Sequence, residues 1–167
     1  MKNIVLIGFM GTGKSAAGRR IAKRLDMRFV STDDMIVKRE KRPITRIFTE
    51  EGEAYFREVE KEAVKEAAAM DNVVIAAGGG AVLDEENMSN LGSKGVIVCL
   101  TASPEAIYER TKKYKTRPLL NVEDPVSKIR ELLEARAPFY RRARYQVDTS
   151  DKTINEVAGD IIGIMKK

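Results

Sequence analysis

The chain has 167 residues, the length of one domain, and its 30 Lys and Arg against 25 Asp and Glu give a formal charge of +5. It contains no histidine, which excludes a Ser-His-Asp or Cys-His catalytic site and any histidine metal ligand. Its single cysteine excludes an internal disulfide. The first apolar run, 4–7, is far shorter than the roughly 18 residues of a membrane helix, so we expect a cytoplasmic protein without a membrane partner.

Apolar runs of strand length alternate with helix-patterned segments along the chain. The strand-like runs are 4–7, 28–30, 73–77, 96–100 and 145–147. The helix-patterned segments are 15–25, about 50–70, the stretch before Pro138, and 154–165. This alternation predicts an α/β fold, a five-stranded parallel sheet flanked by helices. Asp84 and Ser103 are placed to cap the helices that follow them, and Cys99 is expected in the core.

The segment Gly8 to Ser15 reads GFMGTGKS and fits the phosphate-loop pattern G-x-x-x-x-G-K-[ST] between a strand and a helix. Its glycines let backbone N–H groups close around phosphate oxygens. Lys14 can reach the β- and γ-phosphates, and the Ser15 hydroxyl can bind Mg²⁺. The strand and helix context favours this function over an ordinary glycine-rich turn. No Asn-Lys-x-Asp guanine motif occurs, which argues against a switch GTPase.

Two further features point to a site for a second substrate. Gly78-Gly79-Gly80 directly follow a strand, and bare backbone of this kind permits close approach of a bulky group, although a plain turn is the alternative. Arg136 falls on the apolar stripe of its helix, where a guanidinium needs an anionic partner. The alternatives for Arg136 are a stem that reaches the rim of the protein or a structural carboxylate partner.

Three other features indicate a function only when they are taken together. Arg57 follows Phe56, and Glu60 lies three residues on, where it can orient Arg57. Asp33 follows the short strand 28–30 and is equally suited to cap a helix or to take part in chemistry. The basic run 110–117 is ordinarily a solvated surface, but in a kinase such a loop can close over ATP.

These motifs together resemble the shikimate kinase family, over about residues 2 to 148. They are Gly8 to Ser15, Asp33, Phe56-Arg57, Gly78-Gly79-Gly80, Arg117-Pro118-Leu119-Leu120 and Arg136-Ala137-Pro138. The resemblance implies a phosphate-loop kinase in one domain, 1–167, with a mobile substrate-binding segment at about 33–62 and a lid at about 111–124. It also implies ATP-dependent phosphorylation of the 3-hydroxyl of shikimate in aromatic amino-acid biosynthesis.

The resemblance also implies roles for individual residues. ATP would be bound by Gly11, Thr12, Gly13, Lys14, Ser15, Ala16, Arg110 and Arg117, with Arg110 against adenine and Arg117 on the phosphates. Shikimate would be bound by Asp33, Phe48, Phe56, Arg57, Glu60, Gly78, Gly79, Gly80 and Arg136. Lys14, Asp33 and Arg117 would be catalytic, and Ser15 would bind Mg²⁺. We expect a monomer that takes shikimate and no nucleic acid.

The chain departs from the family pattern at one position, and three other functions are compatible with parts of the sequence. The family pattern has an acidic residue two positions before the hydroxyl-binding Asp, where this chain has Ser31, and Asp34 follows instead. The alternatives are a gluconate or nucleoside monophosphate kinase of the same fold, a nucleic-acid-binding module using the basic run 141–145, and an ATP-binding regulator with weak catalysis.

Overall fold

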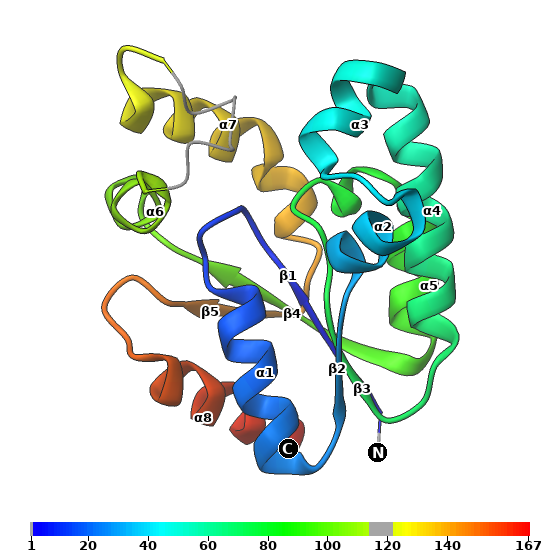
Figure 1. Cartoon of the computed structure of the whole chain (residues 1–167). Coiled ribbons are helices and arrows are strands. Elements are labelled where there is room, and N and C mark those ends of the chain that lie inside the picture. Colours follow the sequence, from blue (N-terminus) through cyan, green and yellow to red (C-terminus); the bar gives the residue numbers. More distant parts are fainter. Residues whose placement is uncertain (1, 114–121) are drawn as a thin grey trace.

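The structure, a computed structural model, describes residues 2–113 and 122–167. Its centre is a five-stranded parallel sheet in the order β2-β3-β1-β4-β5 (Figure 1). The strands are β1 (Asn3–Ile7), β2 (Arg28–Ser31), β3 (Val73–Ala76), β4 (Gly95–Thr101) and β5 (Tyr145–Asp148). The predicted sheet is therefore confirmed, and each strand ends within one residue of its expected limits.

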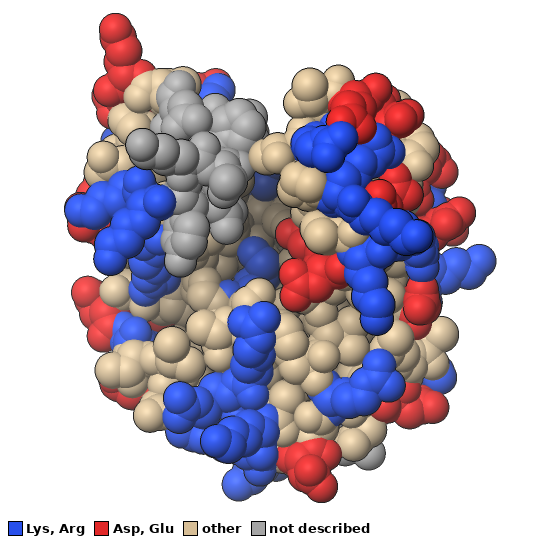
Figure 2. All heavy atoms as spheres, viewed as in Figure 1, with Lys and Arg blue, Asp and Glu red and all other residues tan. Residues whose placement is uncertain are grey.

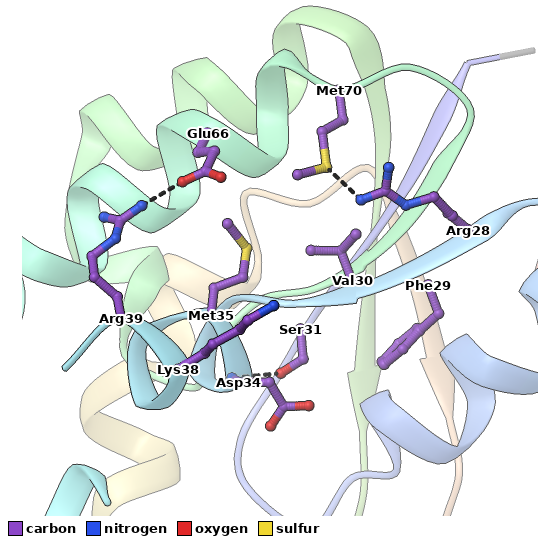
Figure 3. A pocket seen from close by; sticks show the side chains of 10 residues that line it. All are labelled: Arg28, Phe29, Val30, Ser31, Asp34, Met35, Lys38, Arg39, Glu66 and Met70. Atoms are coloured by element: carbon purple, nitrogen blue, oxygen red, sulfur yellow. Dashed lines mark hydrogen bonds and ion pairs between the residues drawn. The ribbon is translucent and has the colours of Figure 1, made fainter. Parts of the chain in front are cut away.

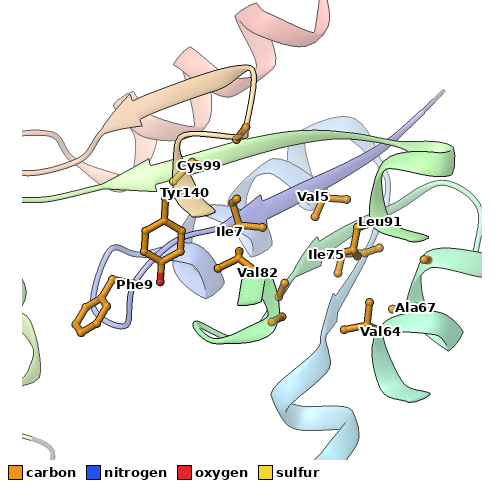
Figure 4. Close-up of a cluster of buried hydrophobic side chains, with 14 of the residues drawn as sticks. Val5, Ile7, Phe9, Val64, Ala67, Ile75, Val82, Leu91, Cys99 and Tyr140 are labelled. Carbon is orange, nitrogen blue, oxygen red and sulfur yellow. The ribbon is translucent and has the colours of Figure 1, made fainter. Parts of the chain in front are cut away.

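Helices cover both faces of the sheet. They are α1 (Lys14–Leu25), α2 (Thr32–Glu40), α3 (Ile44–Glu51), α4 (Glu53–Ala69), the short 3₁₀ helix η1 (Ala81–Leu83), α5 (Glu85–Lys94), α6 (Pro104–Thr111), α7 (Pro125–Tyr140) and α8 (Ile154–Met165). Alternate β1 side chains point to opposite faces, as the strand period requires. Ile4 and Leu6 are buried with Ile21 of α1, whereas Val5 and Ile7 are buried with Val64 of α4 (Figure 4).

The helix expected from about 50 to 70 is confirmed as α4, although it begins three residues later, at Glu53, and a separate helix, α3, ends just before it at Glu51. Gly52 separates them with φ 87° and ψ 170°. A residue with a side chain rarely adopts a positive φ, so glycine is required at this corner. The break leaves α2, α3 and α4 as separate helices between β2 and β3.

Helix α7 also differs from the expectation, because it continues through Pro138 to Tyr140 instead of ending before the proline. Proline has no N–H and removes one bond of the helix. Bonds made further along hold the last turn closed: the Arg141 N–H donates to Ala137 O at 3.0 Å, and Gln146 Nε2 donates to Tyr140 O at 2.9 Å. The second of these comes from β5, beyond the reach of a local sequence pattern.

The smaller expectations hold. Asp84 caps α5 by accepting from the Glu86 N–H at 2.8 Å, and Ser103 caps α6 by accepting from the Ala106 N–H at 3.1 Å. Cys99 is 1% exposed, and burial raises the pKa of its thiol to about 11. The thiol is therefore neutral at ordinary pH and packs as a small core side chain.

Helix α8 provides a test of the fold that is remote from the chemistry. Thr153 Oγ1 accepts from the Glu156 N–H at 3.1 Å, and Glu156 Oε1 accepts from the Thr153 N–H at 3.1 Å, which is a capping box. We expect Thr153→Ala to lower the free energy of unfolding by about 1 kcal/mol in urea titrations, with catalytic constants unchanged. Ser93→Ala, within α5 and exposed, is the control. Equal stability of the two variants would contradict a contribution from the cap.

Candidate active site

The predicted phosphate loop connects the end of β1 to the start of α1. Gly8, Gly11 and Gly13 have φ values of 145°, 78° and 96°. A Cβ on Gly8 would lie 2.4 Å from Leu100 O, and one on Gly11 would lie 2.7 Å from Thr111 Cγ2. The loop conformation thus depends on glycine both for its backbone angles and for its close packing on β4 and α6.

Lys14 lies over the loop that precedes it. Its Nζ donates to Gly8 O at 2.6 Å and to Phe9 O at 3.0 Å. Thr12 Oγ1 donates to the same Phe9 carbonyl at 2.7 Å. The ammonium therefore sits at the loop, next to the N-terminus of α1, where backbone N–H groups and the helix dipole favour an anion. Ser15 and Ala16 follow in the first turn of α1 and are partly exposed.

Arg110 lies beside this loop, where three oxygen atoms hold its guanidinium. Its Nη1 donates to Gly11 O at 3.1 Å and to Thr149 Oγ1 at 3.0 Å, and its Nη2 donates to Thr149 O at 2.6 Å. Thr149 is 3% exposed, and its hydroxyl lies 2.9 Å from Thr12 O. Sequence reasoning missed Thr149 because it belongs to no motif. Contact of Arg110 with adenine stays a prediction.

The triple glycine lies after β3, at the same edge of the sheet as the phosphate loop, since β1 and β3 are parallel neighbours. A different charged side chain lies nearest to each glycine. A Cβ on the first glycine would lie 2.6 Å from Asp33 Oδ1, one on the second 3.5 Å from Arg136 Nη1, and one on the third 2.5 Å from Arg57 Nη1. The bare backbone predicted to admit a bulky group therefore admits the side chains of α2, α7 and α4.

Glu60 completes this cluster from within α4. It is 1% exposed, and its Oε1 accepts from Arg57 Nη1 at 2.8 Å, which is the contact predicted from their spacing. Burial raises the pKa of Glu60, while the Arg57 guanidinium opposes that rise. Arg57 is therefore not the solvated surface charge that it would be by itself. It is held in place against the glycine strip Gly78–Gly80 by a buried carboxylate.

Aromatic rings flank both arginines. The rings of Phe48 and Phe56 have centroids 4.6 Å apart, and the Arg57 guanidinium lies 5.3 Å from the Phe56 centroid. The Arg136 guanidinium lies 5.4 Å from the centroid of Phe9, which is 1% exposed. Such contacts hold a guanidinium without neutralising its charge. Phe9 was not predicted, because it occupies a variable position of the phosphate-loop pattern.

At the start of α2, Ser31 is the helix cap, and Asp33 is left for other contacts. Ser31 Oγ accepts from the Asp34 N–H at 3.2 Å. The Asp34 side chain is 73% exposed and lies 4.0 Å from Arg19 Nη2, so it points away from Asp33 and the glycine strip. The sequence left open whether Asp33 caps the helix, and the structure shows that Ser31 does so instead.

The molecule is hollowed between the side that carries α6 and α7 and the side that carries α2 to α4, and basic side chains lie inside this hollow (Figure 2). Arg117 and its neighbours Pro118, Leu119 and Leu120 lie outside the described residues. In the described part of the chain, no group of three or more Cys, Asp or Glu side chains is arranged to hold a metal ion.

A separate hollow of about 650 Å³ lies along the edge strand β2, on the outside of the sheet (Figure 3). Val30, Met35 and Met70 line it, and its Arg39 is already paired with Glu66. It contains none of the glycines and neither of the two arginines of the glycine strip. It therefore lies apart from the candidate site at the sheet edge that carries the phosphate loop.

The strand order and a phosphate loop after β1 define a phosphate-loop kinase fold. The family model for shikimate kinase matches residues 10–166. A shikimate kinase of Caldanaerobacter subterraneus subsp. tengcongensis is 52% identical over 162 residues, which are 97% of this chain and 95% of that protein. The chain therefore belongs to the shikimate kinase family, and it is an enzyme, a kinase.

Solved structures agree with this assignment. A shikimate kinase from Acinetobacter baumannii in complex with shikimate is 36% identical, with a TM-score of 0.95 over 99% of this chain and 93% of that chain. A gluconokinase from Sinorhizobium meliloti is 18% identical, with a TM-score of 0.62 over 97% of this chain and 90% of that chain, and this likeness shows the fold alone.

In the described residues, no helix is long and apolar enough to cross a membrane.

The glycine contacts predict different effects at two positions. A Cβ added at Gly80 would meet the guanidinium end of the Arg57 side chain, whereas a Cβ added at Gly8 would meet the backbone of β4 and strain a φ of 145°. We expect Gly80→Ala to raise the KM for shikimate at least about ten-fold, because the charge-assisted contact of Arg57 is displaced. Its Tm should also fall, because buried Glu60 loses its partner, whereas Gly8→Ala should lower Tm through the strained loop. A fall in Tm for Gly80→Ala with unchanged KM would contradict this account.

Proposed function

We propose that this chain transfers the γ-phosphoryl group of ATP to the 3-hydroxyl of shikimate, giving ADP and shikimate 3-phosphate. The observation that carries the proposal is the convergence of Asp33, Arg57 and Arg136 on the bare glycine strip beside the phosphate loop. A carboxylate-bearing polyol needs cationic groups for its carboxylate and an acceptor for the reacting hydroxyl. The three side chains supply both.

Arg136 is the principal candidate for the substrate carboxylate. Arg57 already shares its charge with Glu60 at 2.8 Å, whereas Arg136 forms no ion pair with any residue in the described ranges. Its guanidinium lies over Phe9 and against the second glycine of the strip. This geometry argues against the alternative of a structural ion pair. A guanidinium binds a carboxylate through two parallel hydrogen bonds, which fix orientation as well as affinity.

Asp33 is the candidate for the group that orients the reacting hydroxyl. As an acceptor-only carboxylate it would accept the hydrogen bond of the hydroxyl and take its proton as the oxygen attacks the γ-phosphorus. The bond between the γ-phosphorus and the β,γ-bridging oxygen breaks, and ADP leaves. Asp33 lies against Gly78, and the strand before that glycine is the neighbour of β1, so Asp33 is on the same sheet edge as the phosphate loop, where in-line transfer would take place.

Lys14, Ser15 and the loop N–H groups would serve the donor side. The Lys14 ammonium would neutralise charge on the β- and γ-phosphates, releasing Gly8 O and Phe9 O as it does so. Ser15, at the first turn of α1, fits the single protein hydroxyl of a Mg²⁺ ion that is otherwise held by phosphates and water. When bound, Mg²⁺ supplies positive charge to the phosphates.

Several expectations stay predictions. Arg117 would complete the phosphate contacts from the lid at about 111–124, and α2 to α4 would form the substrate-binding segment of a single domain. Arg110, released from Thr149 O and Gly11 O, would face adenine. The monomeric state and the absence of nucleic-acid partners are likewise proposed.

A coupled assay for ADP tests the function, with shikimate, gluconate and a panel of nucleoside monophosphates as acceptors. Of these acceptors, we expect only shikimate to be phosphorylated. We expect Lys14→Ala to reduce kcat at least about 10²-fold, because a positive charge beside the transferring phosphoryl group is lost. Lys23→Ala, exposed on the same helix, is the matched control. Preferred turnover of gluconate, or a folded Lys14→Ala protein of near-normal activity, would contradict the proposal.

The departure at Ser31 provides a test of the metal site. Serine brings no charge and its Oγ already caps α2, so we expect Ser31→Asp to lower the Mg²⁺ concentration needed for half-maximal activity. Aspartate is also a good cap, so α2 should be retained. Asp34→Asn should change this concentration little, because Asp34 points to Arg19 at the surface. A strong effect of Asp34→Asn with none from Ser31→Asp would assign the metal role to Asp34.

A further inference from the structure

We propose that Tyr140 is a positioning residue for the acceptor substrate, and that it acts by fixing the peptide between Gly79 and Gly80. The Tyr140 hydroxyl donates to Gly79 O at 2.9 Å, from the last residue of α7 to the middle of the glycine strip. This bond joins segments 61 positions apart. The proposal rests on the function proposed above and extends it to a residue outside the motifs.

The geometry of a trans peptide links the Gly79 carbonyl to the Gly80 N–H. All peptide bonds of the described residues are trans, so the Gly79 carbonyl and the Gly80 N–H point in opposite directions. Holding the carbonyl on one side therefore aims the N–H at the other. None of the hydrogen bonds among the described residues uses the Gly80 N–H. It is left as a donor for an oxygen atom of the acceptor.

The hydrogen bond from Tyr140 also restricts the backbone conformation of Gly79 and Gly80. Gly79 and Gly80 are adjacent glycines, whose backbone can adopt many conformations at little cost. Gly79 also lies at the junction of the two half-sites, because a Cβ there would be 3.5 Å from Arg136 Nη1, 3.6 Å from Gly8 O and 3.7 Å from Met10 N. A rotation of this peptide would turn the Gly80 N–H away from the acceptor substrate.

The Tyr140 side chain is itself held firmly. It is 6% exposed and belongs to the buried cluster that includes Ile7, Phe9 and Cys99 (Figure 4). Gln146 Nε2 donates to the Tyr140 carbonyl at 2.9 Å, which fixes its backbone after Pro138. Burial raises the pKa of the Tyr140 hydroxyl, although Arg136 opposes the rise, so the group stays protonated and remains a donor.

The test removes the hydroxyl and keeps the ring. We expect Tyr140→Phe to raise the KM for shikimate roughly three- to ten-fold, the effect of one hydrogen bond, with kcat and the KM for ATP changed less than about two-fold. The matched control is Tyr145→Phe, the same change on β5, where the hydroxyl bonds to no other described residue. An unchanged KM for Tyr140→Phe, or an equal change for Tyr145→Phe, would overturn the proposal. Because KM does not depend on the fraction folded, a loss of Tm would not obscure the result.

A second comparison separates the peptide from Arg136, which lies one helical turn before Tyr140. In an Arg136→Lys background, we expect Tyr140→Phe to lower kcat/KM for shikimate by the same factor as in the wild type. Loss of that factor would show that the hydroxyl acts through Arg136, against the proposal. Shikimate affinity is also measured calorimetrically without ATP. Failure of wild-type turnover would then contradict the proposed function, while the binding data still decide the role of Tyr140.

Discussion

The absence of side chains at three consecutive positions after β3 is the constraint on which the site depends. Gly78, Gly79 and Gly80 leave a strip of bare backbone at the carboxyl edge of the sheet. Charged side chains from α2, α4 and α7 reach this strip, although α7 lies far from α2 and α4 in the sequence. A Cβ at the first or the third position would force one of these side chains away. Glycine is therefore needed at these positions, because only bare backbone lets the charged side chains approach one another at this edge of the sheet.

The electrostatics of the cluster divide the two arginines into different tasks. Burying Glu60 is costly, and its contact with Arg57 offsets that cost only while both partners are present. Arg57 is thereby fixed before any substrate arrives, which lowers the entropy lost on binding. Arg136 rests on Phe9 and has no carboxylate partner within the described residues, so its charge is available to an acceptor. Arg57 is thus preorganised, whereas the charge of Arg136 is left for an anionic group of the acceptor.

The sequence predicted what depends on local pattern. The five strands follow from apolar runs, and the phosphate loop follows from glycines whose positive φ values the pattern already requires. The Arg57 and Glu60 contact follows from their helical spacing. The sequence failed where distant groups decide. Helix α7 passes Pro138 because Gln146, on β5, closes its last turn. Thr149 and Tyr140 could not be found, because each acts through a backbone carbonyl of a remote loop.

This division separates the two halves of the site. The phosphate loop is one stretch of chain, from β1 to α1, and Lys14 contacts backbone only a few residues away, although Arg110 and Thr149 also bond to this loop. The acceptor half requires α2, α4, α7 and the glycine strip to be correctly packed. Substitutions in the helices can therefore change the acceptor pocket while the phosphate loop keeps its shape. Selection of the acceptor depends on the packing between elements, whereas Lys14, Ser15 and the loop N–H groups that would bind phosphate come from one continuous segment.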